Sequence, residues 1–215
     1  MQRAGARVFI VDDHSFFRSG LRSLLAEQGF EIVGEAPNGE AALPLIERRR
    51  PDVVVMDLNM PGMSGVETTR CVCEQSPAPT VLVLTVSTAQ GDVIDALEAG
   101  AAGYLLKDAP SDELARGIWA ALDGDTPVSP RVARILVERA RARSGGAAGR
   151  EPASLSEREL EVLRLLAEGM DNGEIAARLY LSPATVKHHV SRIFAKLGVA
   201  NRVQAAIEAV RSGLI

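Results

Sequence analysis

The chain has 215 residues, 47% of them hydrophobic and 24% charged, with a net charge of −4. This balance excludes wholesale disorder and a fibrous repeat, and the length allows one or two domains with cores of their own. No apolar run reaches the ~18 residues of a membrane span, and the two aspartates after Val11 argue against a signal peptide. Two cysteines are too few for a disulfide framework. We therefore expect a cytoplasmic protein.

The first 122 residues alternate short apolar runs with amphipathic stretches of helical length. This alternation predicts βαβ units and a parallel sheet that helices cover on both faces. Pro44 falls inside the second expected helix, where it predicts a kink or a late start. The expected strands are 7–11, 32–35, 53–56, 81–84 and 103–106, and the expected helices are 15–28, 38–49, 65–75, 90–99 and 111–122.

A change of composition separates this part of the chain from the rest. From 123 to 152 the sequence is dominated by Gly, Pro, Arg and Ala, which is typical of a linker. Ser129-Pro130 has the form of a helix cap followed by proline at the first helical position, so we expect one helix over 131–143. The chain therefore divides into a first domain over 1–125, a linker over 126–152 and a second domain over 153–215.

The second domain carries start and stop signals for four short helices. Ser156 and Glu159 have the spacing of a capping box, Ser182-Pro183 marks another helix start, and Asn201 is a further cap. Four short helices, two of them separated by a tight turn, match a helix-turn-helix module. The expected helices run over roughly 157–167, 172–179, 183–197 and 201–212.

Charge is divided unevenly along the chain. Residues 1–130 carry 10 Lys and Arg against 19 Asp and Glu, residues 131–150 carry 6 against 1, and residues 151–215 carry 8 of each. Within the second domain, residues 175–207 hold five cations and no acid. Such a local excess of positive charge favours a polyanionic partner for this domain.

Polar residues directly follow four of the expected strands. Asp12 and Asp13 follow the first strand, Asp57 the third, Thr85 the fourth and Lys107 the fifth. Ligands of open parallel sheets bind beyond the carboxyl ends of the strands, so these side chains are expected to share one edge. Neighbouring carboxylates repel by about 4 kcal/mol per pair at an effective dielectric near 20, and hard oxygen ligands of this kind suit Mg²⁺.

These residues and their neighbours resemble the receiver domain of bacterial response regulators over about residues 6–123. The matching segments read VDDH at 11–14, VMDLNMPGMSG at 55–65, LT at 84–85 and GYLLKD at 103–108. The resemblance implies an α/β, flavodoxin-like (βα)5 fold with strand order 2-1-3-4-5. It also implies that Asp57 accepts a phosphoryl group from a sensor histidine kinase.

The same resemblance assigns roles to the surrounding residues. It implies that Asp12, Asp13 and Asp57 hold Mg²⁺ together with the backbone carbonyl of Asn59. Lys107 would neutralise the phosphoryl oxygens, Thr85 would hydrogen-bond one of them, and Tyr104 would rotate inward when Thr85 moves. Val86 departs from the small residue that is common after this threonine and could alter phosphorylation or hydrolysis rates. His14 is interpreted as a loop residue and not as a ligand.

The third helix of the second domain has one polar face. At about 100° per residue, the apolar side chains from Val186 to Leu197 form a stripe, and His188 lies almost opposite it. Lys187 and His189 lie on the two flanks, and His189 is expected to be a packed structural residue. A solvated face alone would look similar, but the acid-free stretch around this helix favours recognition of a DNA major groove.

The second domain resembles a LuxR-type DNA-binding domain over about residues 153–213, and the whole chain is similar to NarL/FixJ-type response regulators. The matching segments read LSERE at 155–159, EG at 168–169, EIA at 174–176, SPATVKHHV at 182–190 and KLGV at 196–199. The resemblance implies base contacts by Lys187, His188 and Ser191, and phosphate contacts by Thr185, Arg192 and Lys196. It also implies that the last helix, with Val203, Ile207 and Val210, supports dimerisation. Gly173 stands where the family often has a basic residue.

The sequence therefore predicts a DNA-binding transcriptional regulator of a two-component system, with no enzymatic activity of its own. Its expected cofactor is Mg²⁺, and its expected partners are a sensor histidine kinase, double-stranded DNA and a second copy of the chain. Phosphorylation would favour dimers and free the second domain. Two alternatives remain. A flavodoxin-like FMN enzyme would need a phosphate-cradling first loop, which Asp12 and Asp13 oppose, and an atypical receiver would sense ligands or dimerise without phosphorylation.

Overall fold

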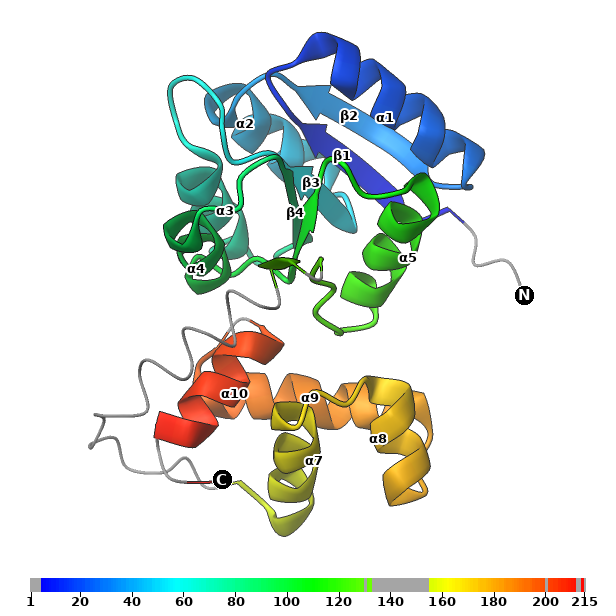
Figure 1. Ribbon diagram of the computed structural model, residues 1–215, viewed down its shortest axis with the longest axis vertical. Helices are drawn as coiled ribbons and strands as arrows, with labels where there is room; N and C mark the ends of the chain where they lie inside the picture. Colours follow the sequence, from blue (N-terminus) through cyan, green and yellow to red (C-terminus); the bar gives the residue numbers. More distant parts are fainter. Residues whose placement is uncertain (1–4, 130, 133–154, 200, 212–213, 215) are drawn as a thin grey trace.

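The structure is a computed structural model that describes residues 5–129, 131–132, 155–199, 201–211 and 214. It contains an α/β domain, formed by the first part of the chain, and a helical domain formed by the last part (Figure 1). None of the helices in these ranges is both long enough and apolar enough to span a membrane.

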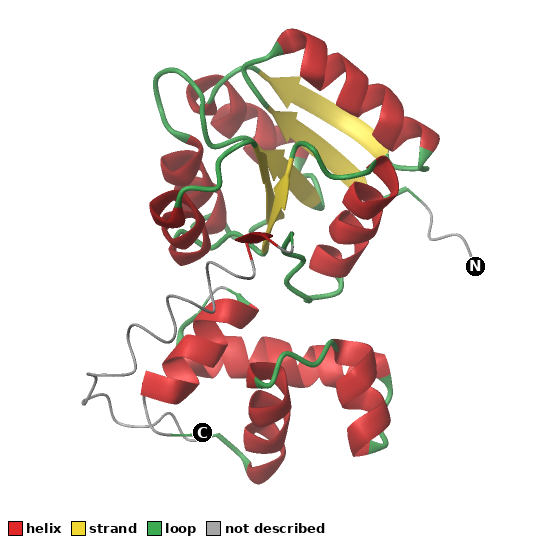
Figure 2. Ribbon diagram, viewed as in Figure 1, coloured by secondary structure: helices red, strands yellow, loops and turns green. Residues whose placement is uncertain are grey.

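One five-stranded parallel sheet forms the centre of the first domain, with the strand order β2-β1-β3-β4-β5. Helices lie on both faces of this sheet (Figure 2). The residues of β3 and β5 are all buried, as expected for a parallel sheet covered on both sides. This confirms the predicted fold and strand order. The strands are β1 (Arg7–Val11), β2 (Glu31–Ala36), β3 (Val53–Met56), β4 (Thr80–Thr85) and β5 (Gly103–Leu106).

The alternation of side chains along the strands explains how the helices are placed. In β1, Val8 and Ile10 pack into a core cluster with residues of α1 and α5, whereas Phe9 and Val11 pack on the opposite face with residues of α2. A third cluster joins α4 to Tyr104 of β5. The helices are α1 (Ser15–Glu27), α2 (Gly39–Arg49), α3 (Gly65–Cys73), α4 (Gln90–Glu98) and α5 (Ser111–Leu122).

The boundaries differ from the expected ones by no more than two residues, and of the two alternatives expected for Pro44, a kink or a late start, the late start is excluded. The helix that contains Pro44 does not start late, because α2 begins at Gly39. Asn38 fixes this start, since its side-chain oxygen accepts a hydrogen bond from the backbone N–H of Ala41 at 2.9 Å. Pro44 is therefore accommodated inside a helix whose first turn has a strong cap.

The second domain contains the four predicted helices: α7 (Glu157–Ala167), α8 (Asn172–Leu179), α9 (Pro183–Leu197) and α10 (Arg202–Arg211). Its core joins Val162 of α7, Ile175 of α8 and Val190 of α9. The capping box at Ser156 and the side-chain cap at Ser182 are both present. The expected linker helix over 131–143 lies, from residue 133 onward, outside the described residues.

Gly65 at the start of α3 generates a prediction about stability. A Cβ atom at this position would lie 2.0 Å from the carbonyl oxygen of Asp57 and 2.6 Å from Cα of Leu58. Both atoms belong to the backbone and cannot rotate away. We expect Gly65→Ala to lower the free energy of unfolding of the first domain by about 1–3 kcal/mol.

Urea unfolding followed by the fluorescence of Trp119, the one tryptophan of the sequence, measures this change because Trp119 lies in α5. Gly20→Ala is the matched control, since a Cβ there would meet no atom within 4 Å. Gly20 lies inside α1, so its replacement should stabilise the helix by about 0.5–1 kcal/mol. Equal stabilities of the two variants would contradict the prediction.

Candidate functional site

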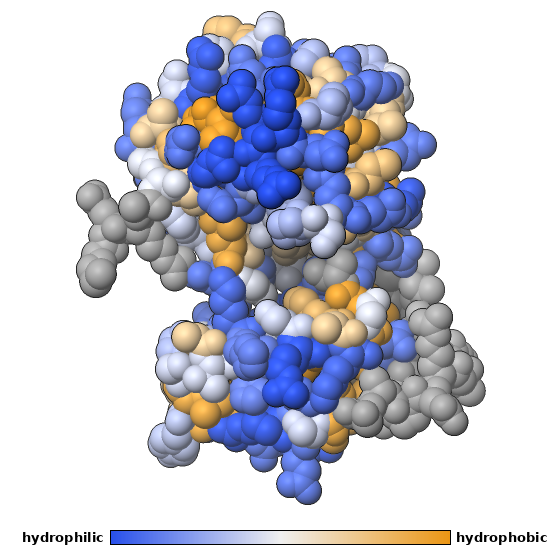
Figure 3. All heavy atoms as spheres, turned by 180° about the vertical axis from the view of Figure 1, so that it is seen from behind, coloured by the Kyte–Doolittle hydropathy of each residue, from blue (hydrophilic) through white to orange (hydrophobic). Residues whose placement is uncertain are grey.

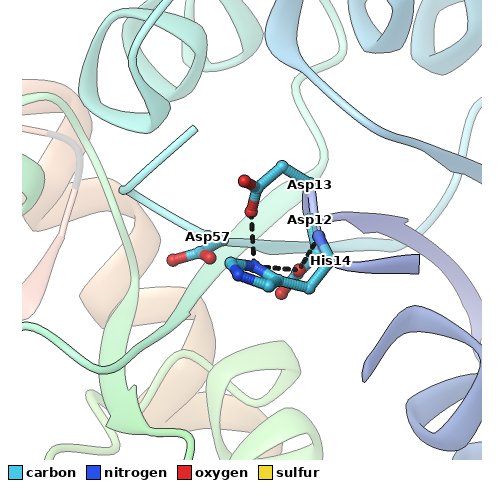
Figure 4. A group of neighbouring side chains, drawn as sticks. All are labelled: Asp12, Asp13, His14 and Asp57. Carbon is cyan, nitrogen blue, oxygen red and sulfur yellow. Dashed lines mark hydrogen bonds and ion pairs between the residues drawn. The ribbon is translucent and has the colours of Figure 1, made fainter. Parts of the chain in front are cut away.

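An acidic cluster lies at the carboxyl ends of β1 and β3. Asp12 follows β1 and Asp57 follows β3, and these residues are only 2% and 3% exposed. Figure 4 shows Asp12, Asp13 and His14 on one loop, with Asp57 on the neighbouring one. One ligand atom from each of the four residues lies within 4.8 Å of the others. The strand order thus brings the predicted acids together at one edge.

Lys107 joins this cluster from the end of β5. Its Nζ lies 2.5 Å from Oδ2 of Asp12 and 2.6 Å from Oδ2 of Asp57. Burial acts to lower the pKa of Lys107, but its hydrogen bonds to the two carboxylates outweigh this effect and raise the pKa above its usual value. Lys107 therefore carries its positive charge at neutral pH and bridges the two buried acids.

The donor set fits a hard divalent cation. The three carboxylates and the one ammonium leave two negative charges in this group, and burying such charges without compensation is costly. Oδ1 of Asp13 is buried and accepts no hydrogen bond, although Nδ1 of His14 lies 2.7 Å away. Carboxylate oxygens of this kind are the ligands that Mg²⁺ prefers.

His14 lies beside the acidic cluster, and most of its side chain is exposed to solvent. Its side chain is 69% exposed, and its backbone N–H donates to Oδ1 of Asp12 at 2.8 Å. Arg18 supports the same loop, because one of its guanidinium nitrogens donates to the carbonyl oxygen of Asp12 at 2.6 Å. The backbone N–H of Asn59 donates to Oδ1 of Asp57 at 3.3 Å. Backbone groups thus orient both buried acids.

Thr85 and Tyr104 lie on the strands β4 and β5 and are fully buried. The backbone N–H of Ser87 donates to Oγ1 of Thr85 at 3.4 Å, and the hydroxyl of Tyr104 donates to the carbonyl oxygen of Ser87 at 3.0 Å. Burial raises the pKa of Tyr104, so its hydroxyl keeps its proton. Ser87, which sequence reasoning missed, also donates to Asp92 of α4. Ser87 accepts the hydrogen bond of Tyr104 through its backbone carbonyl, which every residue has, so no sequence motif indicates this role.

Helix α9 presents the predicted polar face. Val186 and Val190 are buried, whereas Lys187, His188 and Ser191 are exposed. His189 is half-buried, and its Nδ1 is buried without a hydrogen bond. The helix begins at Ser182, whose Oγ accepts from the backbone N–H of Thr185 at 3.1 Å.

Two cations of α9 are paired inside the second domain. Nζ of Lys196 lies 2.6 Å from Oε2 of Glu159, and Nε of Arg192 lies 3.5 Å from Oε1 of the same residue. Glu159 belongs to α7 and is only 1% exposed. Lys196 and Arg192 therefore fasten α9 to α7, a role that the sequence does not reveal. Their contact with phosphates remains a prediction.

Lys187, on the exposed face of α9, contacts the first domain. Nζ of Lys187 donates to the carbonyl oxygen of Leu122, the last residue of α5, at 2.7 Å. The backbone N–H of Asn172 donates to Asp125 at 3.1 Å, and Arg202, only 8% exposed, lies 3.3 Å from the same carboxylate. Seen from behind relative to Figure 1, the two domains form two lobes with a narrower region between them (Figure 3).

The start of α10 makes a second contact with the first domain, at the end of α4. Nδ2 of Asn201 donates to the carbonyl oxygens of Leu97 and Ala101 at 2.7 and 3.0 Å, and Nε2 of Gln204 donates to that of Leu97 at 2.7 Å. Asn201 is only 2% exposed and also caps α10, as predicted, because its Oδ1 accepts from the backbone N–H of Gln204. Val203 packs against the cluster around Tyr104.

Comparison with known proteins gives a match for each domain. Residues 8–118 match the model of the response regulator receiver domain, and residues 153–209 match that of the bacterial regulatory proteins of the luxR family. The chain is 40% identical to the transcriptional regulatory protein LiaR of Bacillus subtilis over 97% of this chain and 99% of LiaR.

Solved structures resemble the whole chain as well. The crystal structure of ChrA, a response regulator in a heme-sensing two-component system, is 39% identical, covers 99% of this chain and 100% of its own, and has a TM-score of 0.54. RcsB, a two-component response regulator solved in complex with DNA, is 26% identical, with a TM-score of 0.58 and coverage of 96% and 98%.

The buried carboxylate of Glu159 predicts that the stability of the second domain depends on pH. Its hydrogen bonds with Lys196 and with the backbone N–H of Ser156 lower the pKa of Glu159 to about 2. The ionised form therefore stabilises the folded domain above the ordinary carboxyl value of 4.5, and this stabilisation is lost as the pH falls toward 2. Glu159→Gln should lower the free energy of unfolding by about 1–3 kcal/mol at pH 7, and the difference from wild type should shrink below pH 4.5.

Urea unfolding followed by the helical circular dichroism signal measures the free energy of unfolding of the two proteins at each pH. The fluorescence of Trp119 reports the unfolding of the first domain separately. Glu161→Gln is the matched control, because Glu161 of the same helix is 52% exposed in its side chain and pairs only with Arg158 among the described ion pairs. Exposed pairs contribute little to stability. A pH-independent difference between Glu159→Gln and wild type would contradict the assignment.

Proposed function

The chain belongs to the two-component response regulators that join a receiver domain to a LuxR-type DNA-binding domain, and we propose that phosphorylation of Asp57 controls its binding to DNA. The observation that supports the phosphoacceptor role best is the bridge from Lys107 to Asp12 and Asp57, beside the further carboxylate of Asp13. The two domains support transcriptional regulation, and we propose that the chain acts as a regulator and not as an enzyme. A cytoplasmic location remains a prediction.

In the proposed reaction, a carboxylate oxygen of Asp57 attacks the phosphorus of a phosphohistidine on a sensor kinase. The new P–O bond forms as the P–N bond breaks, and the electron pair of that bond stays with the histidine. Lys107 lies 2.6 Å from Oδ2 of Asp57 and would neutralise charge on the transferred group. Asp12, Asp13, Asp57 and the backbone carbonyl of Asn59 would hold Mg²⁺, which supplies electrostatic stabilisation of the phosphoryl oxygens when bound.

The proposed output is binding of α9 in a DNA major groove. Lys187, His188 and Ser191 would face base edges, and Thr185, Arg192 and Lys196 would approach phosphates. Three of these residues form one exposed face, which supports the proposal. In the described arrangement, however, Nζ of Lys187 is bound to the carbonyl of Leu122. DNA binding through Lys187 therefore requires this hydrogen bond to break, as it would if the two domains separated.

We propose that phosphorylation favours this separation through α4. Thr85 and Tyr104 are both hydrogen-bonded to Ser87, which also contacts Asp92 of α4. The other end of α4 holds the second domain through Asn201. A rearrangement at Thr85 therefore has a continuous route to the contact between the domains, and a bias of a few kcal/mol suffices for such a shift.

The proposed active form is a dimer on a two-fold DNA site. Ile207 of α10 is 41% exposed, which supports a role for this helix in pairing, whereas Val203 packs against the first domain. The side chain of Val210 lies outside the described part. Separation of the domains would thus expose Val203 beside Ile207, and two copies of α9 would double the base contacts on a two-fold site.

Incubation with acetyl phosphate and Mg²⁺, followed by intact mass spectrometry, tests the phosphoacceptor role. Wild type should gain the mass of one phosphoryl group, and Asp57→Ala should gain none. Asp108→Asn is the control, because Asp108 neighbours Lys107 in the chain but is 74% exposed in its side chain. If wild type gains no phosphoryl mass from acetyl phosphate or from a cognate kinase, the result favours a receiver that works without phosphorylation. Flavin absorbance in the purified protein would instead favour the FMN enzyme.

Lys187→Ala tests the DNA-binding face. Its affinity for promoter DNA, identified by genome-wide mapping of bound sites, should fall about tenfold, as expected for one lost base contact of 1–3 kcal/mol. Phosphorylation of Asp57 should be unchanged, and the affinities are compared on phosphorylated protein so that the Leu122 contact does not interfere. Arg164→Ala removes the same charge from the exposed side of α7 and serves as control. Unchanged binding by Lys187→Ala would remove Lys187 from the recognition face.

A further inference from the structure

Phe17 in the first turn of α1 lies against the ammonium group of Lys107. Nζ of Lys107 is 4.5 Å from the centroid of the Phe17 ring. The same Nζ contacts carboxylate oxygens of Asp12 and Asp57 at 2.5 and 2.6 Å. The ammonium group therefore has two carboxylates and one aromatic ring as neighbours, and its side chain is only 11% exposed.

A cavity beside Lys107 makes this ring contact consequential. The cavity has a volume of about 310 Å³, and Phe17, Leu84, Leu106, Leu114 and Lys107 are among its lining residues. Its lining is mainly apolar, with Ser111 as the one polar uncharged side chain among the lining residues, so the flexible stem of Lys107 has room to change its conformation there. The attraction of the Phe17 ring for the ammonium group therefore limits the positions that Nζ of Lys107 can take.

We infer that Phe17 is a positioning residue for phosphoryl transfer, because the face of its ring holds Nζ of Lys107 beside Asp57. The face of an aromatic ring carries partial negative charge and attracts an ammonium group. A divalent cation bound by Asp12 and Asp57 would weaken the attraction of these carboxylates for Lys107. The ring is uncharged and keeps its own attraction, so its contribution matters most in the loaded site. This inference rests on the proposed phosphoacceptor role of Asp57.

A purely structural role for Phe17 makes different predictions from a positioning role. Phe17 is partly buried against the core cluster of α1 and α5. Phe17→Leu keeps much of the apolar volume but removes the ring, whereas Phe17→Tyr keeps the ring. Phe16→Leu is the matched control, since Phe16 lines the same cavity and is 92% exposed.

Nuclear magnetic resonance of the full chain with labelled lysine tests the contact directly. The sequence has only three lysines, Lys107, Lys187 and Lys196, so each side-chain signal can be assigned by one Lys→Arg variant. Protons over the face of a ring are shifted upfield by its ring current. The ε-methylene signal of Lys107 should move downfield in Phe17→Leu and stay in place in Phe16→Leu. An unmoved signal in Phe17→Leu overturns the inference.

Phosphorylation by acetyl phosphate with Mg²⁺ tests the consequence. The rate at saturating acetyl phosphate should fall about three- to tenfold in Phe17→Leu, with little change in the concentration that gives half the maximal rate. Phe17→Tyr should restore the rate, and Phe16→Leu should not alter it. A wild-type rate in Phe17→Leu, or an equal loss in Phe17→Tyr, overturns the positioning role alone. A wild-type chain that gains no phosphoryl group overturns the proposed function and the positioning role together.

Discussion

The bridge from Lys107 to Asp12 and Asp57 is the interaction on which the site depends. β1 and β3 are neighbours, but β5 is separated from β3 by β4. The side chain at the end of β5 must therefore cross the end of β4 to reach the acids, which the four-carbon stem of a lysine can do and which the short side chain of Thr85 permits. Both acids are almost fully buried, and removal of the ammonium group that bridges them would cost about 3–5 kcal/mol.

The contact between the domains follows from another electrostatic constraint. The last carbonyl groups of a helix have no partner within the helix and carry partial negative charge. Donors from the second domain add hydrogen bonds at the ends of α4 and α5. Asn201 and Gln204 donate to the carbonyl of Leu97, which also accepts from the backbone N–H of Gly100, and Lys187 donates to that of Leu122. Water can replace such donors, so the net stabilisation is only about 0.5–1.5 kcal/mol per hydrogen bond. A contact of this kind holds the domains together and still allows a modest change to release them.

The sequence predicts the strand ends well because each short apolar run stops at a polar residue, and the parallel order then brings these residues to one edge. It predicts the exposed face of α9 for a similar reason, since helical periodicity determines which side chains point away from the core. The partners of those side chains are less predictable. Lys187 contacts a backbone carbonyl of the other domain, and Glu159 pairs with two cations from another helix. Neither the carbonyl nor a tertiary ion pair leaves a pattern in the sequence.

The positive stretch of the second domain therefore offers less charge than its composition indicates. Of the five cations between 175 and 207, four are held by partners among the described residues: Lys187 by Leu122, Arg192 and Lys196 by Glu159, and Arg202 by Asp125. Only two of these contacts cross between the domains. Separation would release Lys187 and Arg202, whereas Arg192 and Lys196 would stay fastened to α7. In the proposed DNA complex, separation would therefore free Lys187 of the predicted contact face, and a cation freed near DNA phosphates adds to both affinity and salt sensitivity.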